Sequence, residues 1–322
     1  MDERKYTVGI DIGGTNTVIG MVADTGSIVD CVKIPTIGHA SPETFVGCIA
    51  AEIEKFVKRL PAQSIVAGIG VGVPCANAET GLVEGAANLP WPNFPLVRLM
   101  EDAAGMPTFI TNDANAAAIG EMTYGVAQGI DNFIMLTLGT GVGAGIVVDG
   151  HLLSGSRGYA GELGHMVFHF AADRMCACGR RGCLQTVSSA GGVVETARRL
   201  LDSEAIPSCL RDIDRDALSA RDIGRAAEKN DALALEVFRF TGDAIGTACA
   251  SFAAFSDPDA IILFGGVAGA ARFMVDAMRE ALEREALYVY KGRIRILNSS
   301  LPEADAALLG AASLPLHYEK RI

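Results

Sequence analysis

Asp11-Ile-Gly-Gly-Thr-Asn16 lies between two stretches rich in β-branched residues, 6–12 and 17–22. Both stretches predict β-strands, and the glycines fall where the chain would reverse between them. A third such stretch, 28–34, extends the pattern to a meander of three strands. Glycines let backbone N–H groups approach an anion closely, and the Thr15 hydroxyl can join them. The turn is therefore a candidate phosphate site, although Asp-x-Gly-Gly is equally typical of an ordinary hairpin turn.

The same unit recurs in the second half of the chain. Leu138-Gly-Thr-Gly-Val-Gly-Ala-Gly145 again places a glycine-rich turn between two β-rich stretches, with Thr140 in the place of Thr15. Two turns of the same chemistry predict an internally duplicated chain and favour a phosphate clamp over two plain turns. A glycine pair after the strand expected at 260–264 is weaker evidence, because a strand-to-helix turn has the same signature. The further phosphate candidates in this half are Gly141, Gly143, Gly265 and Gly266.

The other elements follow from hydrophobic periodicity and helix-start signals. Ser41 and Pro42 form an N-cap and first-turn pair that opens a helix with one apolar stripe. A long helix is expected from Ala232, with Leu235, Phe238, Ile245, Cys249 and Phe252 on its core face. The remaining expected elements are strands at 65–73, 108–111, 260–264 and 293–297, and helices at 114–122, from 267 and at 304–313.

Composition bounds the class of protein. The 322 residues are 50% hydrophobic and carry a formal net charge of −11, which favours two lobes with a cleft between them. The acidic balance argues against a nucleic-acid partner, and no apolar run reaches the roughly twenty residues of a membrane span. The chain opens on a charged tip that runs directly into a strand, with no leader sequence. We expect a cytoplasmic protein with no membrane partner.

Three of the eight cysteines crowd into one short loop. Cys176, Cys178 and Cys183 are separated by small residues and arginines, and His165 lies upstream of them. Three thiolates and one imidazole form the closed tetrahedral set that structural zinc takes. His169 is an alternative fourth ligand, and a group of reduced surface thiols is the plain alternative to a metal. A closed site organises a loop rather than activating water, so catalysis is expected elsewhere.

Asn112-Asp113 lies where a strand is expected to end and a helix to begin. The plain role of Asp113 is the N-cap of that helix. The functional alternative is a base that aligns a hydroxyl nucleophile, because a loose phosphoryl-transfer transition state needs position more than basicity. Asp113 is therefore the candidate catalytic residue.

These motifs, in this order, resemble the ROK family of repressors, open reading frames and sugar kinases. The resemblance covers essentially the whole chain and implies a two-lobed actin-like ATPase (ribonuclease H-like) fold, α/β in class, with a duplicated βββαβα core and a zinc-binding loop at 165–183. Residues 1–118, completed by a C-terminal helix at 304–322, would form the lobe that binds sugar and phosphate. Residues 119–303 would form the lobe that binds nucleotide. The segments that carry the resemblance are Asp11-Ile-Gly-Gly-Thr-Asn16, Asn112-Asp113-Ala-Asn-Ala-Ala-Ala118, 138–145, Gly161-Glu-Leu-Gly-His165, 176–183 and Phe264-Gly-Gly-Val267.

The resemblance also implies a role for each candidate residue. Asp113 would be the catalytic base, and Asp11 would hold Mg2+ through water. His165 would give one ring nitrogen to zinc and the other to the sugar. The implied ATP and phosphate contacts are Asp11, Gly13, Gly14, Thr15, Asn16, Thr140, Gly141, Gly143, Gly265 and Gly266. The implied sugar contacts are Asn88, Asn112, Asp113, Glu162, His165 and Gln185, and the zinc ligands are His165, Cys176, Cys178 and Cys183.

Two positions depart from the family pattern. Gln185 stands where most sugar kinases of the family have a glutamate that reaches the sugar. Charge-assisted hydrogen bonds are roughly twice as strong as neutral ones, so we expect sugar binding weaker by ~1 kcal/mol, or a different sugar. Cys75 ends Gly72-Val-Pro-Cys75, where the family has glycine, which alters a turn expected to contact substrate. Asn88-Leu-Pro-Trp91, in contrast, resembles the glucokinase-like members, in which such a segment borders the sugar pocket.

The implied function is transfer of the ATP γ-phosphate to the 6-hydroxyl of glucose by a homodimer that uses MgATP and a structural Zn2+ ion. Kinases of N-acetylmannosamine, N-acetylglucosamine, allose or fructose are alternatives within the class. A sugar-sensing repressor would need a DNA-binding domain, whereas only about five residues precede the first expected strand. A sugar-binding protein without catalysis is the third alternative, against which Asp11, Thr15, Asp113 and Thr140 argue.

Overall fold

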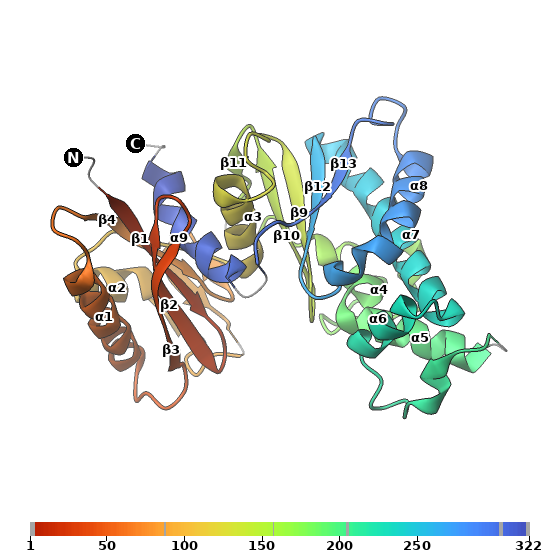
Figure 1. The fold of residues 1–322 in the computed structure, drawn as a ribbon, viewed down its shortest axis with the longest axis horizontal. Coiled ribbons are helices and arrows are strands. Elements are labelled where there is room, and N and C mark those ends of the chain that lie inside the picture. Colours follow the sequence, from red (N-terminus) through yellow and green to blue (C-terminus); the bar gives the residue numbers. More distant parts are fainter. Residues whose placement is uncertain (1–3, 87, 157, 204–205, 303–304, 320–322) are drawn as a thin grey trace. The chain divides into compact units, whose positions relative to one another are not determined.

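The computed structural model describes residues 4–86, 88–156, 158–203, 206–302 and 305–319, and the chain divides into two units (Figure 1). Unit 1 comprises Met1–Gly129, Leu152–Ala160 and Ser300–Ile322, and unit 2 comprises Ile130–His151 and Gly161–Ser299. The boundary expected at 118/119 falls inside helix α3 (Asp113–Tyr124), which belongs wholly to unit 1. A helix packs as one body, so the first segment of unit 1 continues past its end.

Each unit is built on one five-stranded sheet, and the two sheets repeat one strand order. In both, the first two strands form an antiparallel hairpin and the two later strands are added in parallel. This repeat confirms the internal duplication predicted from the two glycine turns. In order across each sheet, the strands are β3 (Ile28–Pro35), β2 (Asn16–Ala23), β1 (Lys5–Ile12), β4 (Ile65–Gly72) and β8 (Thr108–Thr111) in unit 1, and β11 (His151–Leu152), β10 (Val142–Val148), β9 (Phe133–Leu138), β12 (Ala260–Phe264) and β13 (Arg295–Asn298) in the second sheet.

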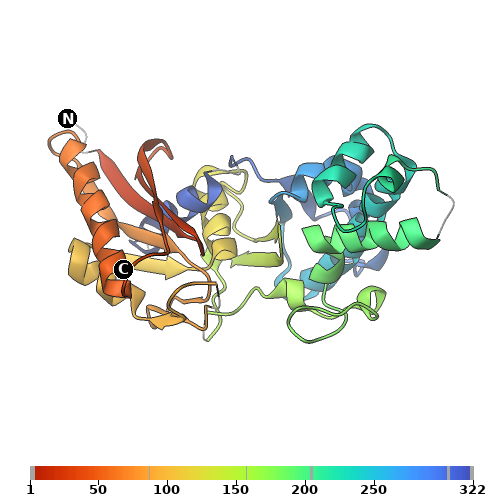
Figure 2. The same cartoon turned by 90° about the horizontal axis from the view of Figure 1, so that it is seen from below.

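Helices and one small sheet complete the two units (Figures 1 and 2). Unit 1 has α1 (Pro42–Arg59), α2 (Leu96–Ala104), α3, α9 (Ala306–Glu319) and a three-stranded sheet of β5 (Ala76–Asn77), β6 (Leu82–Glu84) and β7 (Asn93–Phe94). Unit 2 has α4 (Gln185–Ser188), α5 (Ala190–Ser203), α6 (Ala220–Glu228), α7 (Ala232–Ser256), α8 (Val275–Glu285) and the 3-10 turns η1 (Leu163–His165), η2 (His169–Ala171), η3 (Cys209–Asp212) and η4 (Ala268–Phe273).

In unit 1, helices cover both faces of the sheet. Val8 and Ile10 of β1 belong to the core that includes the buried face of α1. Gly9, between them, faces α9, because successive strand residues point to opposite faces. The predicted start of α1 is confirmed: the Ser41 side chain accepts a hydrogen bond from the Thr44 N–H, with proline in the first turn.

The terminal helix was expected to end at Ser313, but α9 continues through Pro315 to Glu319. Proline lacks the N–H that would bind the carbonyl oxygen four residues earlier, that of Ala311. This oxygen lies so close to Gly70 on β4 that no Cβ would fit there. Because Gly70 has no side chain, its Cα–H groups can approach the Ala311 oxygen and take the place of the missing helical hydrogen bond. The expected start of this helix, Ala304, lies outside the described residues.

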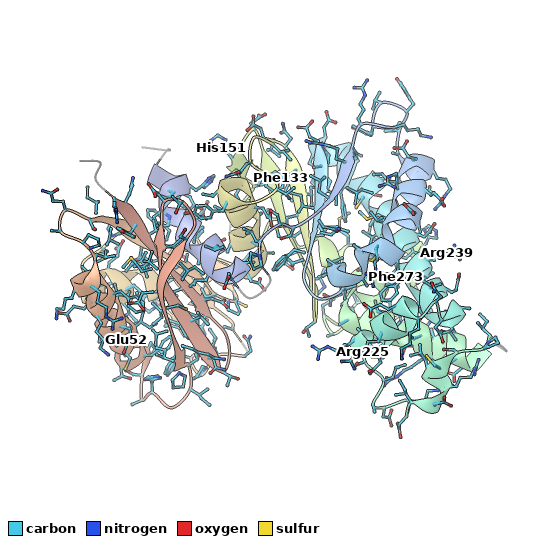
Figure 3. The ribbon with its side chains drawn as sticks, viewed as in Figure 1. Glu52, Phe133, His151, Arg225, Arg239 and Phe273 are labelled. Atoms are coloured by element: carbon cyan, nitrogen blue, oxygen red, sulfur yellow. The ribbon has the colours of Figure 1, made fainter. Side chains whose placement is uncertain are left out.

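In unit 2, α7 packs along α8, and its apolar face fills the core together with the second sheet. Four of the five residues predicted to line the core face of α7 are buried, because Phe238, Ile245, Cys249 and Phe252 are at most 2% exposed, whereas Leu235 is only partly buried against the same core. Phe133 on β9, labelled in Figure 3, is fully buried as well. The helix expected from Val267 is instead the 3-10 turn η4 followed by α8 from Val275. Within the described residues, no helix has both the length and the apolar character needed to cross a bilayer.

Candidate functional site

The first glycine turn joins β1 to β2 and is closed by a hydrogen bond from the Gly13 N–H to the Asn16 carbonyl oxygen (3.0 Å). Thr36, directly after β3, fixes it: its hydroxyl donates to the Gly13 carbonyl (2.7 Å) and its N–H to the Thr15 carbonyl (2.9 Å). The Thr15 side chain is exposed. With both carbonyl oxygens bound by Thr36, the turn has a fixed backbone and a free hydroxyl at its tip.

The segment 88–91 lies against this turn. A Cβ at Gly14 would lie only 2.6 Å from the Asn88 carbonyl oxygen, so only glycine fits at that position. Trp91 is held by Phe45 of α1 (ring centroids 5.5 Å apart) and by Phe94 of β7 (6.2 Å). The Asn88 side chain is exposed. The structure therefore places a predicted sugar contact beside the predicted phosphate turn.

Two carboxylates lie near the carboxyl ends of β1 and β8, which are separated by β4 in the sheet. Asp11 is half-buried near the end of β1, and its pKa is raised, first by burial and second by the negative charge of Asp113. Asn112, not Asp113, is the N-cap of α3: the Asn112 Oδ1 accepts from the Asn115 N–H (2.8 Å). The interpretation of Asp113 as the N-cap is therefore wrong. Because Asn112 provides the cap, Asp113 occupies the first helical position with an exposed side chain whose Oδ1 accepts from the Ala114 N–H (3.0 Å).

The second glycine turn joins β9 to β10 and is closed by a hydrogen bond from the Gly139 N–H to the Gly141 carbonyl oxygen (3.0 Å). Thr140 at its tip is exposed, as Thr15 is in the first turn. Gly265, with φ +97°, follows β12 and lies against the end of β9, where a Cβ would come within 2.7 Å of the Leu138 carbonyl oxygen. The predicted nucleotide contacts of unit 2 are thus neighbours.

The predicted zinc ligands converge. One ligand atom from each of His165, Cys176, Cys178 and Cys183 lies within 4.8 Å of all the others. The Cys178 and Cys183 sulfurs are 3.6 Å apart, and the His165 Nδ1 is 3.8 Å from the Cys176 sulfur. Nitrogen and sulfur ligands at tetrahedral zinc are about 3.6 to 3.8 Å apart, as bond lengths of about 2.0 to 2.3 Å require. The group fits zinc in both composition and spacing.

The thiols of the loop differ in how readily they would ionise. Hydrogen bonds from the backbone and side chain of Arg180 are the main causes that lower the pKa of Cys178 to about 6. Burial is the main cause that raises the pKa of Cys183 to about 12, and hydrogen bonding with the neighbouring thiols adds to it. A buried thiol of this kind ionises at neutral pH only beside a positive charge, which a divalent metal supplies.

His165 has its two ring nitrogens in different surroundings. Nδ1 faces the cysteine cluster, whereas Nε2 lies 3.9 Å from the Glu162 Oε2, whose side chain is 56% exposed. His169, the alternative fourth ligand, lies outside the cluster and packs edge-on against Phe170 (ring centroids 5.9 Å apart). The geometry therefore selects His165 as the ligand and leaves its second nitrogen beside a carboxylate.

Gln185, the first residue of α4, does not stand free. Its Nε2 donates to the Cys176 sulfur (3.1 Å), and its Oε1 accepts from the Val142 N–H (3.5 Å). It therefore touches both the cysteine cluster and the start of β10, beside the second glycine turn.

The candidate residues form one group in each unit. The unit 1 group is Asp11, Gly13, Gly14, Thr15, Asn16, Asn88, Asn112 and Asp113, and the unit 2 group is Thr140, Gly141, Gly143, Glu162, His165, Cys176, Cys178, Cys183, Gln185, Gly265 and Gly266.

Sequence reasoning did not identify two supporting residues, Thr36 and Arg174. Arg174 is 6% exposed and donates to the carbonyl oxygens of Thr186 (2.8 Å) and Gly192 (3.2 Å). It thereby fixes the cysteine loop to α4 and α5. The sequence holds three arginines in and beside this loop and nothing that marks the buried one, and no motif distinguishes Thr36 from the other threonines of the chain.

Two sheets of one order, each with a glycine turn between its first two strands, define a two-unit α/β protein of the actin-like ATPase fold. The chain belongs to the ROK family, whose model matches residues 7–317.

The relatives include enzymes and regulators. A glucokinase of Halalkalibacterium halodurans is 36% identical over 290 residues, which cover 89% of this chain and 88% of that protein. The crystal structure of a ROK family glucokinase from Streptomyces griseus in complex with glucose and AMPPNP is 31% identical, covers 96% of this chain and 98% of its own, and has a TM-score of 0.72. The xylose repressor of Bacillus subtilis is 27% identical over 314 residues, which cover 97% of this chain and 77% of that protein. Function therefore has to be argued from the site.

Proposed function

We propose that the protein is an ATP-dependent sugar kinase that transfers the γ-phosphoryl group of MgATP to the 6-hydroxyl of glucose. The observation that carries the proposal is that Asn112, and not Asp113, caps α3. Asn112 caps the helix, and Asp113 is left exposed in the first turn, near enough to Asp11 for its charge to raise the Asp11 pKa. A carboxylate needed only for the cap would sit at the N-cap position itself. The glucokinase relatives support the same activity.

In unit 1, Asp113 is the base that aligns the sugar hydroxyl and receives its proton as the bond to phosphorus forms. Late proton removal suffices, because the transition state is loose and its charge lies on the phosphoryl oxygens. Asp11 would hold the Mg2+ ion of MgATP through water, as the family resemblance implies. A divalent cation next to Asp11 would also offset the repulsion from Asp113 that raises the Asp11 pKa. The proposed phosphate contacts are Gly13, Gly14, Thr15 and Asn16, and the proposed sugar contacts are Asn88, Asn112 and Asp113.

In unit 2, the turn around Thr140 binds the remaining ATP phosphates, because its exposed hydroxyl repeats that of Thr15 in the first turn. The other proposed nucleotide contacts are Gly141, Gly143, Gly265 and Gly266. Glu162 and the Nε2 of His165 bind sugar hydroxyls. His165, the last residue of η1, would thus serve sugar and metal with its two nitrogens, which would fix the ring tautomer.

Zn2+ is proposed as the resident metal, held by His165, Cys176, Cys178 and Cys183. When bound, it supplies charge to the thiolates and rigidity to the loop. His165, Cys176, Cys178 and Cys183 would fill a four-coordinate zinc site, so no position would remain for water or sugar. The loop residues then orient His165 through its metal-facing nitrogen.

The choice of glucose rests on the glucokinase relatives and on the resemblance of 88–91 to glucokinase-like members. N-acetylmannosamine, N-acetylglucosamine, allose and fructose are the alternative acceptors. Gln185 offers the sugar no carboxylate, so binding is expected to be weaker than with a glutamate there. Regulation of transcription, the activity of the xylose repressor relative, is the second candidate function. A homodimer is the proposed assembly.

The test is ADP release from MgATP across glucose, mannose, fructose, allose, N-acetylglucosamine and N-acetylmannosamine, with Asp113→Asn protein as the blank. Release far above this blank with one sugar supports the kinase and ranks its acceptors. If no sugar stimulates release while one still raises the melting temperature, the protein binds sugar without catalysis and the proposal is wrong.

A further inference from the structure

Gln185 spans the gap between the cysteine cluster and the second glycine turn. Its Nε2 donates to the Cys176 sulfur (3.1 Å), and its Oε1 accepts from the Val142 N–H (3.5 Å). The same oxygen would lie 3.4 Å from a Cβ built on Gly141, the last residue of the turn. A single side chain thus touches a predicted metal ligand and a predicted phosphate-binding turn.

The chemistry of the amide fixes its orientation. With Nε2 toward the sulfur, the side chain offers two N–H donors to a thiolate acceptor, and the carbonyl oxygen faces an N–H donor. The reverse orientation would set the carbonyl oxygen against the sulfur lone pairs and the amide donors against the Val142 N–H. Glutamate has the same length but no donor, so it would bring a carboxylate against the thiolate. The hydrogen bond from Gln185 to the Cys176 sulfur therefore depends on glutamine standing where the family pattern has glutamate.

The backbone around Gln185 forms a second connection. Cys183 is the last proposed ligand, α4 begins two residues later, and α5 follows it immediately. The Ala190 N–H at the start of α5 donates to the Gly139 carbonyl oxygen in the turn (2.8 Å). The buried Arg174, before the first cysteine, binds carbonyl oxygens of both helices. Both ends of the cysteine loop are thus fixed to the helices that hold the turn.

We propose that Gln185 is a positioning residue that couples the metal centre to the second glycine turn, so that metal binding strengthens nucleotide binding. The coupling rests on the proposed function, because the turn's ligand is taken to be the phosphates of a nucleoside triphosphate. It is reciprocal: the nucleotide strengthens metal binding by the same factor. The Gln185 amide is then engaged by the protein and serves the nucleotide side of the site, rather than replacing the sugar-binding glutamate.

The test compares wild type with Gln185→Met, which keeps length without polar atoms, and Gln185→Glu, which keeps shape without the donor. Gln128→Met, an exposed residue of unit 1, is the matched control. In cobalt(II)-loaded protein, loss of the N–H···S bond raises the energy of the sulfur electrons, so the near-ultraviolet thiolate-to-cobalt band should move to longer wavelength in both Gln185 variants. Their metal affinity, measured by competition with a chelator, should fall about 10- to 100-fold. The control should match wild type in both measurements.

The coupling itself is measured as zinc affinity with and without a saturating non-hydrolysable ATP analogue. In wild type the analogue should raise zinc affinity at least about fivefold, and in Gln185→Met this factor should fall toward one. An equal factor in both proteins, or a cobalt band that does not move, would overturn the proposal even if the enzyme is a sugar kinase. If wild type binds the metal but not the analogue, the proposed function fails and the coupling fails with it. The cobalt band then still shows whether Gln185 contacts Cys176.

Discussion

Glu121 is a fully buried carboxylate on α3 whose two oxygens hold two backbone segments of unit 1. Its Oε2 accepts from the Val126 N–H (2.7 Å) and its Oε1 from the Leu301 N–H (3.3 Å). Val126 lies just before Gly129, where the chain first leaves unit 1, and Leu301 follows Ser300, where it enters the unit for the last time. One side chain therefore joins the first and the last segment of unit 1, and replacing it should weaken this unit well beyond the effect of a surface charge.

The size of the effect follows from the two hydrogen bonds. Glu121→Gln keeps the shape but turns one accepting oxygen into an NH2 group. The amide oxygen is expected to keep the shorter bond to Val126, so the Leu301 N–H loses this acceptor, at a cost of about 1–3 kcal/mol for a buried donor. The remaining bond also loses its charge, worth about 1 kcal/mol. We expect the free energy of unfolding of unit 1 to fall by about 2–4 kcal/mol.

The assay is urea unfolding followed by the fluorescence of Trp91, the single tryptophan, which lies in unit 1 and therefore reports on this unit. Glu52→Gln is the control (Figure 3): Glu52 forms a surface ion pair with Lys55 (2.7 Å), a type of contact worth about 0–1 kcal/mol. A loss in Glu121→Gln no larger than that of the control would show that the buried carboxylate does not hold the two segments together.

Four further predictions concern the site. Asp113→Asn should keep the fold and a sugar-induced rise in melting temperature while turnover falls on the order of 10²- to 10⁴-fold; unchanged turnover would remove Asp113 from the mechanism. Asp11→Asn should raise the unfolding midpoint at pH 7, because burial and the charge of Asp113 raise the Asp11 pKa and thus make its ionised form unfavourable in the folded state. This gain in stability should vanish well below pH 3.8, because Asp11 is then protonated in both the folded and the unfolded protein. Elemental analysis of unchelated protein should find one zinc per chain, and a chelator should lower the melting temperature; metal-free protein of equal stability would contradict the metal assignment. Cys75→Gly should stabilise the protein by about 0.5–1 kcal/mol in urea unfolding. Cys75 has φ +56°, a left-handed conformation that costs a non-glycine residue about 1–2 kcal/mol, whereas glycine adopts it without strain and pays only a smaller entropic cost. A destabilised variant would show that the contacts of the cysteine side chain outweigh this strain.

Elements with a local signal could be predicted from the sequence. The hairpin around Gly13 and Gly14, the Ser41 cap and the apolar face of α7 each depend on residues close in the chain. The continuation of α9 through Pro315 could not be predicted, because it depends on Gly70, which lies far away in the sequence. The backbone of Gly70 packs against the Ala311 carbonyl oxygen, which proline leaves without its helical hydrogen bond. The strands β5, β6 and β7, of two or three residues each, are too short to show a period.

The same distinction applies to the site. The cluster of possible metal ligands was predictable because three of the four lie within one loop, and the preference of zinc for sulfur and imidazole restricts the fourth. The choice of His165 over His169 depended on which imidazole the fold turns toward the cysteines. The cap of α3 was assigned one residue too late, since Asn112 and Asp113 are both good N-cap residues and only the backbone at the end of β8 separates them. The partners of Gln185 have no sequence signal, because Val142 binds through its backbone.

The duplicated sheets explain why the cysteine loop occurs where it does. In unit 1 the third strand, β3, has eight residues and leads directly to Thr36, which binds two carbonyl oxygens of the first glycine turn. Its counterpart β11 has two residues and ends at Leu152, too short to reach its own turn in this way. The chain that follows β11 contains the cysteine loop and then α4 and α5, from which Gln185 and the Ala190 N–H reach the second turn. The cysteine loop therefore stands in for the missing length of strand, and the proposed metal, which would have no free coordination position, would suit that role, because the second turn requires a rigid support.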